Sequence, residues 1–263
     1  HTKSAVPKKD PTVAIVPTMG ALHRGHLELI RIAKTKADLC VVSIFVNPTQ
    51  FLAGEDLDRY PKPIEQDIAA CESMDVDVLF CPTVDQMYNE KSFIGFTIDT
   101  LADNLCGKTR PGHFEGVIQI VNKLFNLVQP NMAVFGQKDY QQYRIIEQMV
   151  EEYMHPVKLL MAPIIRDFDG LALSSRNRYL SAEERNIANS LYKALELIKN
   201  TVLNDRRVEL NPAQEILTKA GLKIDYIGLY DAKTLQPITS VKGNAKCVAA
   251  GAVYVGKTRL IDN

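Results

Sequence analysis

The first part of the chain alternates short apolar runs with segments whose apolar residues recur at helical spacing. The runs are rich in β-branched residues, which predicts buried strands. They span 13–16, 39–46, 76–80, 132–135 and 157–161. Helical spacing follows over 27–37, 117–128 and 140–153. Strands that alternate with helices predict an α/β fold with a Rossmann-like parallel sheet.

A different pattern begins after about residue 164. Ser181 with Glu184 is typical of a helix N-terminus, and the apolar stripe that follows predicts one helix reaching Val202. Asn211, followed by proline, predicts the cap of a second helix, and two antiparallel strands are expected over 223–230 and 246–255. We therefore expect two domains, 1–164 and a smaller C-terminal α+β domain, 165–263.

Composition excludes several classes of protein. Lysine plus arginine equals aspartate plus glutamate at 31 each, so no bulk positive field favours nucleic acid or an anionic membrane. No apolar run reaches the roughly 18 residues of a membrane span, and no signal peptide is predicted. Five scattered cysteines without a C-x-x-C pair suggest neither a disulfide framework nor a zinc site. We expect a cytoplasmic protein.

The turn after the first predicted strand carries the first candidate chemistry. It places His23 and His26 three residues apart with Gly25 between them, at the start of a helix. The carboxyl edge of a parallel sheet is where ligands bind, and free N–H groups at a helix start favour an anion. The pattern predicts a polyphosphate site. The alternatives are two surface histidines or two metal ligands, and zinc is disfavoured because His1, His113 and His155 show no ligand spacing.

A Walker-like segment near the C-terminus offers a second phosphate motif. Residues 251–258 match the Walker A pattern, G-x-x-x-x-G-K-[ST], letter for letter. A phosphate loop must lead into a helix, however, and residues 252–255 favour a strand. We predict no phosphate site there.

Five ordered segments together resemble one family. These are PTMGALH at 17–23, FVNPTQF at 45–51, RPGHF at 110–114, FGQKDYQQ at 135–142 and LSSRN at 173–177. They are similar to the pantothenate synthetase family, within the nucleotidyltransferases that carry a His-x-Gly-His motif. The resemblance covers about 13–262. The chain departs from the family pattern at Gln137, where glutamate is usual, and in largely lacking a helix before the first strand.

The resemblance implies a reaction. Pantoate would attack ATP to give pantoyl adenylate and pyrophosphate, and β-alanine would then displace AMP to form pantothenate. ATP with Mg²⁺, pantoate and β-alanine are the implied small molecules, and a homodimer is the implied assembly. Residues 1–164 would bind ATP and pantoate, and 165–263 would act as a lid.

The resemblance also assigns site residues. His26, His23 and Lys138 are the implied catalytic residues, with His113 on the substrate side. Gln50 and Gln142 would bind pantoate and β-alanine, and no residue is assigned to a metal. The implied ATP-binding residues are Met19, Gly20, Ala21, Leu22, His23, Arg24, Gly25, His26, Gly136, Gln137, Lys138, Asp139, Ile165, Leu173, Ser174, Ser175 and Arg176.

Two other functions remain open at this point. A nucleotidyltransferase that passes AMP to a phosphate acceptor would explain the histidine turn but not Gln50 and Gln142 in their motifs. A non-catalytic nucleotide-binding regulator would require the loss of a catalytic position, and none is evident.

Overall fold

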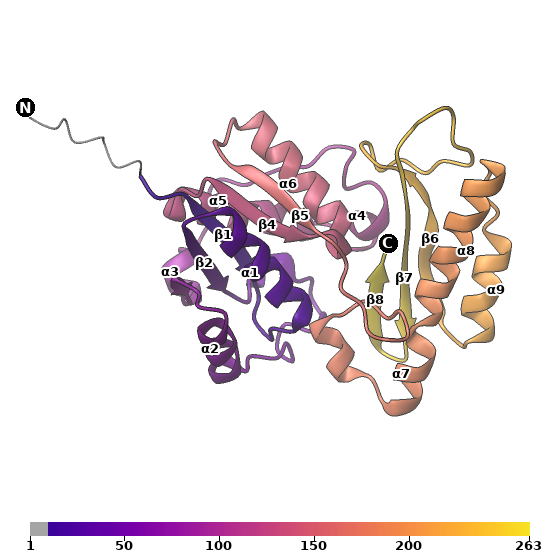
Figure 1. Ribbon diagram of the computed structural model, residues 1–263, viewed down its shortest axis with the longest axis horizontal. Coiled ribbons are helices and arrows are strands. Elements are labelled where there is room, and N and C mark those ends of the chain that lie inside the picture. Colours follow the sequence, from indigo (N-terminus) through magenta and orange to yellow (C-terminus); the bar gives the residue numbers. More distant parts are fainter. Residues whose placement is uncertain (1–9) are drawn as a thin grey trace, which may run out of the picture.

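Two β-sheets, each with its own helices, organise the chain (Figure 1). The computed structural model describes residues 10–263. The expectations about a signal peptide and about a helix ahead of the first strand fall on residues before 10, outside the described part. No helix of the described residues is long and apolar enough to cross a membrane.

The larger sheet is parallel, as predicted, with strand order β3-β2-β1-β4-β5. Its strands are β1 (Val13–Thr18), β2 (Leu39–Ile44), β3 (Val78–Phe80), β4 (Met132–Gly136) and β5 (Lys158–Ala162). Its helices are α1 (Arg24–Lys36), α2 (Ile64–Ser73), α3 (Val84–Met87), α4 (Leu105–Thr109), α5 (His113–Val128) and α6 (Tyr140–Glu152). Single 3₁₀ turns occur at η1 (Pro48–Gln50) and η2 (Gln137–Asp139).

The strand pattern holds because successive side chains point to opposite faces of the sheet. In β1, Ile15 packs in the cluster formed with α5 and α6, whereas Ala14 and Val16 pack in the cluster formed with α1 and α2. The strand predicted over 39–46 ends at Ile44, two residues early, because the chain turns toward Pro48, which has no N–H to donate. Helices α2, α3 and α4 were not anticipated.

The smaller sheet is antiparallel with order β6-β7-β8 and is flanked by three helices. Its elements are α7 (Ala182–Ala188), α8 (Ser190–Asp205), α9 (Asn211–Lys219), β6 (Lys223–Asp231), β7 (Cys247–Val255) and β8 (Thr258–Asp262), preceded by the 3₁₀ turn η3 (Ser175–Tyr179). The antiparallel pair is confirmed. The Walker-like segment belongs to the β7–β8 hairpin, so it lacks the helix that a phosphate loop requires.

Three details of this part differ from the sequence prediction. The single helix expected from Ser181 is two helices, because the chain breaks at Asn189, a weak helix former whose side chain reaches the carbonyl of Asp169 at 3.5 Å. The capping box of Ser181 and Glu184 is present. Asn211 does not cap α9; it is the first helical residue, and Leu210 stands at the cap. The prediction also omitted β8.

The boundary between the two domains remains a prediction at 164/165. The residues that follow β5 form a small hairpin, in which Arg166 bridges to Ala172, before η3 and α7 begin. In Figure 1 the C-terminal end of β8 lies between the two sheets rather than on the far side of the smaller one.

Close packing of α5 against η1 generates a prediction. A Cβ on Gly116 would lie 2.7 Å from the backbone nitrogen of Gln50 and closer still to the carbonyl of Thr49. We expect Gly116→Ala to lower the free energy of unfolding by about 1–3 kcal/mol and to displace Gln50. Urea denaturation measures the first effect. Gly95→Ala is the control, since nothing lies within 4 Å of its Cβ position; equal losses for both variants would contradict the prediction.

Candidate active site

A buried carboxylate shapes the turn after β1. Asp67 of α2, 2% exposed, accepts the backbone N–H groups of Ala21 at 2.8 Å and Leu22 at 2.7 Å. Gly20 adopts φ +78, and a Cβ there would meet the Asp67 carboxylate at 2.8 Å. A charged acceptor for two buried donors makes this turn rigid. It fixes the point from which α1 and its two histidines start.

His23 and His26 are held by their Nδ1 atoms. The backbone N–H of Gly25 donates to Nδ1 of His23 at 3.1 Å, and the backbone N–H of His23 donates to Nδ1 of His26 at 3.3 Å. The two ring centroids lie 4.1 Å apart. Because Nδ1 acts as the acceptor in each ring, the proton of a neutral ring must be on Nε2. Each ring therefore offers one Nε2–H donor.

Both rings are neutral at physiological pH. Burial, with help from His26 and Lys138, lowers the pKa of His23 to about 3. Burial and Lys138 lower the pKa of His26 to about 4. Desolvation and a nearby cation disfavour the charged imidazolium, so both causes act in the same direction. The site thus presents two neutral donors beside the Lys138 side chain.

The glycine between the histidines is required by ring packing. A Cβ on Gly25 would lie 2.8 Å from Cε1 of His23. Of the N–H groups at the helix start, those of Gly25, His26 and Leu27 have acceptors within the turn. The imidazole Nε2–H groups are therefore the main donors that the two histidines and this turn offer to an anion.

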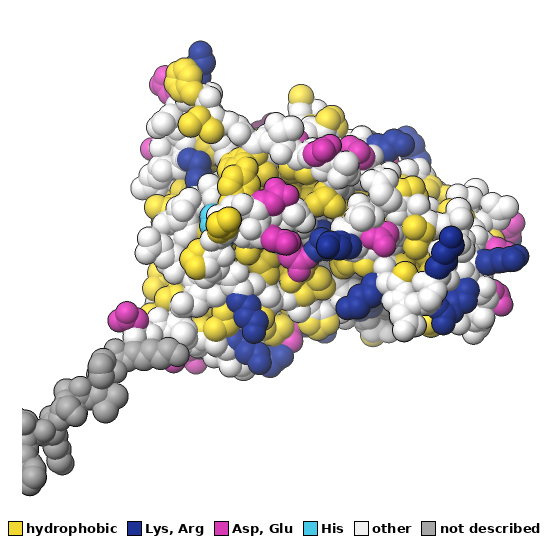
Figure 2. Space-filling view, turned by 90° about the horizontal axis from the view of Figure 1, so that it is seen from above, with side chains coloured by type: hydrophobic (Ala, Val, Ile, Leu, Met, Phe, Trp, Pro, Cys, Tyr) yellow, Lys and Arg dark blue, Asp and Glu magenta, His cyan; other side chains and the backbone are white. Residues whose placement is uncertain are grey.

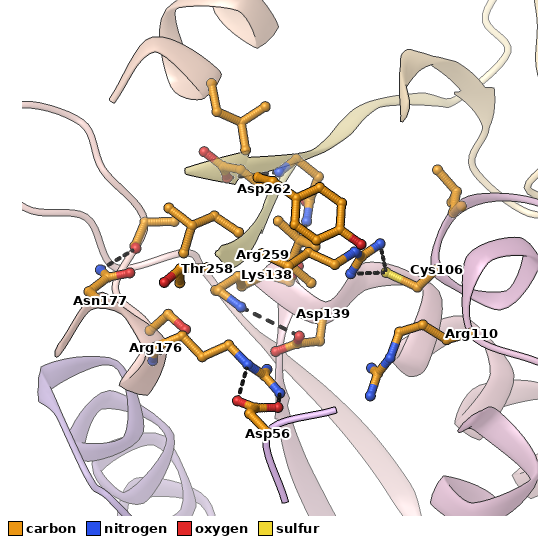
Figure 3. A pocket seen from close by; sticks show the side chains of 18 of the residues that line it. Asp56, Cys106, Arg110, Lys138, Asp139, Arg176, Asn177, Thr258, Arg259 and Asp262 are labelled. Atoms are coloured by element: carbon orange, nitrogen blue, oxygen red, sulfur yellow. Dashed lines mark hydrogen bonds and ion pairs between the residues drawn. The ribbon is translucent and has the colours of Figure 1, made fainter. Parts of the chain in front are cut away.

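Lys138 follows β4, the strand that pairs in parallel with β1, so it lies at the same edge of the sheet as the two histidines. It stands in η2, directly after β4, with its side chain 19% exposed and its Nζ 3.5 Å from Asp139 Oδ1. Figure 3 shows Lys138 and Asp139 pointing into the space between the sheets. The ammonium group lowers the pKa of both histidines, so its charge lies close enough to act on both rings.

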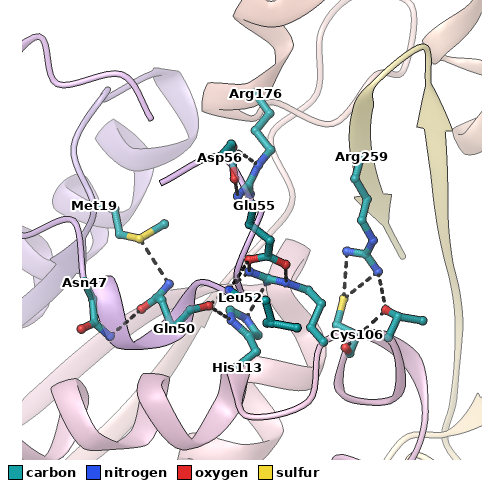
Figure 4. Close-up of polar contacts among 12 residues, drawn as sticks. Met19, Asn47, Gln50, Leu52, Glu55, Asp56, Cys106, His113, Arg176 and Arg259 are labelled. Atoms are coloured by element: carbon teal, nitrogen blue, oxygen red, sulfur yellow. Dashed lines mark hydrogen bonds and ion pairs between the residues drawn. The ribbon is translucent and has the colours of Figure 1, made fainter. Parts of the chain in front are cut away.

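The two glutamines differ in how they are held. Gln50, 8% exposed, accepts from Asn47 Nδ2 at 3.0 Å through Oε1, and its Nε2 points to the sulfur of Met19 at 3.2 Å (Figure 4). The Gln50 amide is therefore fixed with its oxygen toward Asn47 and its N–H₂ group toward Met19. Gln142, on the first turn of α6, also lines the cavity. Its neighbour Gln141 is instead buried and binds backbone groups near α4.

An acidic loop that the sequence reasoning missed binds two arginines of the site. Glu55 binds Arg110 through two hydrogen bonds of 2.6 and 2.5 Å, and Asp56 binds Arg176 through two of 2.9 Å (Figures 3 and 4). Although burial alone would raise them, the arginines hold the pKa values of both carboxyls below their usual range. His113 donates through Nδ1 to the Gln50 carbonyl at 2.7 Å, so it supports Gln50 from behind.

Most of the predicted residues line one cavity of about 220 Å³. Those brought together are Met19, His23, Gly25, His26, Gln50, His113, Gly136, Lys138, Asp139, Gln142, Ile165, Leu173, Ser174, Ser175 and Arg176. Five do not line it: Gly20, Ala21, Leu22, Arg24 and Gln137. Arg24 turns outward to Asp167 at 3.1 Å, and Gln137 faces Asn263 at 3.3 Å. A larger space of about 850 Å³ adjoins the cavity, lined by residues of the smaller sheet and by helices and loops of the part that holds the larger sheet.

Charge outside the site is mixed. On the face drawn in Figure 2, lysine and arginine side chains are interspersed with aspartate and glutamate. Attraction for an anionic ligand therefore comes from the local cations of the cavity and not from a surface field.

The fold and the cavity are those of a nucleotide-site α/β enzyme, and comparison with known proteins identifies the family. The family model for pantoate-beta-alanine ligase matches residues 1–263. The chain belongs to this family. It is an enzyme that ligates pantoate to β-alanine and so makes pantothenate.

Individual relatives agree along the whole chain. Pantothenate synthetase of Psychrobacter arcticus is 47% identical over 258 residues, covering 96% of this chain and 90% of the relative. The structure of the Thermus thermophilus enzyme matches with a TM-score of 0.91 at 41% identity, covering 95% and 92% of the two chains. The Francisella tularensis ligase, solved with β,γ-ATP and β-alanine, matches with a TM-score of 0.81 at 38% identity, covering 97% and 90%.

The role of Asp67 can be tested directly. Asp67→Asn keeps one acceptor but turns an N–H₂ group toward a backbone N–H, so we expect the free energy of unfolding to fall by about 1–3 kcal/mol and ATP binding to weaken as the turn loosens. Urea denaturation and calorimetry measure the two effects. Glu65→Gln, an exposed position in the same helical turn, is the control. Indistinguishable unfolding curves for the two variants would rule out Asp67 as the anchor.

Proposed function

We propose that ligation at this cavity proceeds through pantoyl adenylate. A carboxylate oxygen of pantoate attacks the α-phosphorus of ATP, and pyrophosphate leaves with the electrons of the broken P–O bond. The amine of β-alanine then attacks the acyl carbon, and AMP leaves. The observation that carries the proposal is the meeting of two Nε2–H donors, one lysine and two glutamines in one cavity.

The histidines and the lysine act on the phosphates. Phosphoryl-type transfer needs positioned charge more than a protein nucleophile. Neutral His23 and His26 donate from Nε2 to phosphate oxygens, with His26 stabilising charge that develops on the transferring and leaving groups. Lys138 adds a compact positive charge. Neither imidazole donates a proton outright, since both stay neutral near pH 7.

The glutamines select the acid. Gln50, with Oε1 already bound to Asn47, donates through Nε2 to an oxygen of pantoate. Gln142, on α6, lines the same cavity with an amide that both donates and accepts. His113 fixes the Gln50 backbone.

The remaining ATP contacts come from three segments. Met19 and Gly25 follow β1, Gly136 and Asp139 flank Lys138, and Ile165 and Leu173–Arg176 close the cavity from the side of the smaller sheet. Gly20, Ala21, Leu22, Arg24 and Gln137 support these segments from outside the cavity lining. Arg176 pairs with Asp56 through Nε and Nη2, which leaves its other N–H groups to donate to phosphate.

Magnesium enters with the nucleotide. Among residues 10–263, no group of three or more His, Cys, Asp or Glu side chains is placed to hold a metal ion. Phosphate oxygens would supply most of its ligands, and the ion would offset triphosphate charge. We further propose that 165–263 act as the lid, that the enzyme works as a homodimer, and that it is located in the cytoplasm.

Product analysis tests the proposal. With ATP, pantoate and β-alanine we expect pantothenate, AMP and pyrophosphate in equal amounts, measured by chromatography. An enzyme that only transfers AMP to a phosphate acceptor would form no pantothenate, and a nucleotide-binding regulator would form no product. ADP with phosphate would refute acyl-adenylate chemistry.

Gln142→Glu tests selection of the acid. The change removes a donor and places a carboxylate beside anionic pantoate, so we expect pantoate to bind at least about tenfold more weakly, given that like charges about 4 Å apart repel by several kcal/mol at a partly buried site. ATP binding should be largely retained. Calorimetry with each ligand measures both.

Gln148→Glu provides a matched control for this charge change. It lies on the same helix, makes an exposed contact with Glu152, and is not part of the cavity lining. Equal weakening of ATP and pantoate by Gln142→Glu, or no weakening of pantoate, would remove Gln142 from the acid-binding role.

A further inference from the structure

The side chain of Asn263, which follows the last strand of the smaller sheet, reaches the η2 turn that carries Lys138. Asn263 follows β8, and its Nδ2 donates to the backbone carbonyls of Gln137 at 3.0 Å and Lys138 at 2.9 Å. Both N–H bonds of the amide are therefore used on two consecutive carbonyls of η2. The two segments are more than a hundred residues apart in the sequence, so this contact joins the two sheets at the residue assigned to the phosphates.

The amide has only one workable orientation. Carbonyl oxygens accept but never donate, so the N–H₂ end of Asn263 must face η2. Its Oδ1 then accepts from Gln137 Nε2 at 3.3 Å. A glutamine at 137 supplies this donor, whereas an ionised glutamate would set a carboxylate against the Asn263 oxygen. The unusual residue of this chain thus takes part in orienting Asn263.

Asn263 is itself held on its own side. Asp262, with its side chain 3% exposed, binds Arg166 through hydrogen bonds of 2.6 and 2.9 Å and accepts from the backbone N–H of Asn263 at 2.7 Å. Arg166 also donates to the Asn263 carbonyl at 3.2 Å and stacks over Tyr192 at 4.3 Å. Figure 3 shows Asp262 on β8 above Lys138. The contact to η2 therefore starts from a rigid support.

The Lys138 turn has little internal support. It is a single 3₁₀ turn of three residues between β4 and α6, with no side-chain cap at its start. Short 3₁₀ segments have poor hydrogen-bond geometry, so external donors matter more for their position. Two donors on the carbonyls of 137 and 138 fix the peptide plane that carries the Lys138 side chain.

We propose that Asn263 is a positioning residue that holds the η2 turn so that the Lys138 ammonium group faces the phosphates. The inference rests on the proposed function, in which Lys138 binds ATP. Asn263 is not among the residues that line the 220 Å³ cavity. It acts through Lys138 and makes the placement of that charge depend on the docking of β8.

A double-mutant cycle tests the proposal with the whole enzyme. Single-turnover acyl-adenylate formation is measured by rapid quench for the wild type, Asn263→Ala, Lys138→Ala and the double variant. We expect Asn263→Ala to slow adenylation by roughly tenfold, the scale of losing two neutral hydrogen bonds, and Lys138→Ala to slow it more. The double variant should match Lys138→Ala within about twofold, because a residue that acts through Lys138 has no effect once that side chain is gone.

Two further variants separate positioning from structural damage. Asn263→Asp keeps size and the acceptor for Gln137 but removes both donors, so it should show the same loss even if Asn263→Ala folds poorly. Asn104→Ala removes another amide contact to the C-terminal part, to Gln236 at 3.2 Å, away from Lys138. It should leave adenylation within about twofold of the wild type, by the same limit for sites without shared partners.

The outcomes distinguish two kinds of failure. If Lys138→Ala slows adenylation but folded Asn263→Asp does not, the positioning role is overturned and the function of Lys138 stands. If adding Asn263→Ala to Lys138→Ala slows adenylation as much as adding it to the wild type, Asn263 acts by another route. The proposal is then likewise overturned. If Lys138→Ala adenylates at the normal rate, the proposed role of Lys138 fails, and the inference about Asn263 fails with it.

Discussion

The site depends on two hydrogen bonds from backbone N–H groups to imidazole Nδ1 atoms at the start of α1. They determine which nitrogen of His23 and His26 carries the proton, and burial then keeps both rings neutral. Other features make the bonds possible: Gly25 leaves room for the His23 ring, and Asp67 fixes the turn from which α1 begins. Neutral donors suit a site that already holds the lysine charge, because a second cation there would be costly without its ligand.

The rest of the cavity comes from two parts of the chain. Lys138 and Gln142 come from the end of β4 and the start of α6, whereas Arg176 comes from the segment that leads to the smaller sheet. In this structure Arg176 is paired with Asp56, and Lys138 with Asp139. Each basic group thus has a carboxylate partner, which offsets part of the positive charge gathered in the cavity.

Periodicity and turn chemistry were sufficient to predict the parallel sheet and the place of His23 and His26, because those signals are local. Long-range partners were not predictable. Nothing near Asp67 in the sequence indicates that its carboxylate binds Ala21 and Leu22, and nothing near Asn263 points to Lys138. The position of the proton on His26 could not be predicted either, since it follows from a hydrogen bond and from burial, which exist only in the folded chain. The break at Asn189 was missed because the apolar stripe continues across it.

The most direct test of neutral histidine donors is nitrogen NMR of the imidazoles of His23 and His26 between pH 7.5 and 5. Since the folded pKa values are about 3 and 4 and the unfolded value is 6.5, the folded rings should stay neutral across this range, and the enzyme should lose stability as the pH falls below 6.5 because only the unfolded rings take up protons. We expect both rings to keep the proton on Nε2 with unchanged shifts. Titration of either ring near pH 6.5, or a proton on Nδ1, would contradict the neutral-donor mechanism.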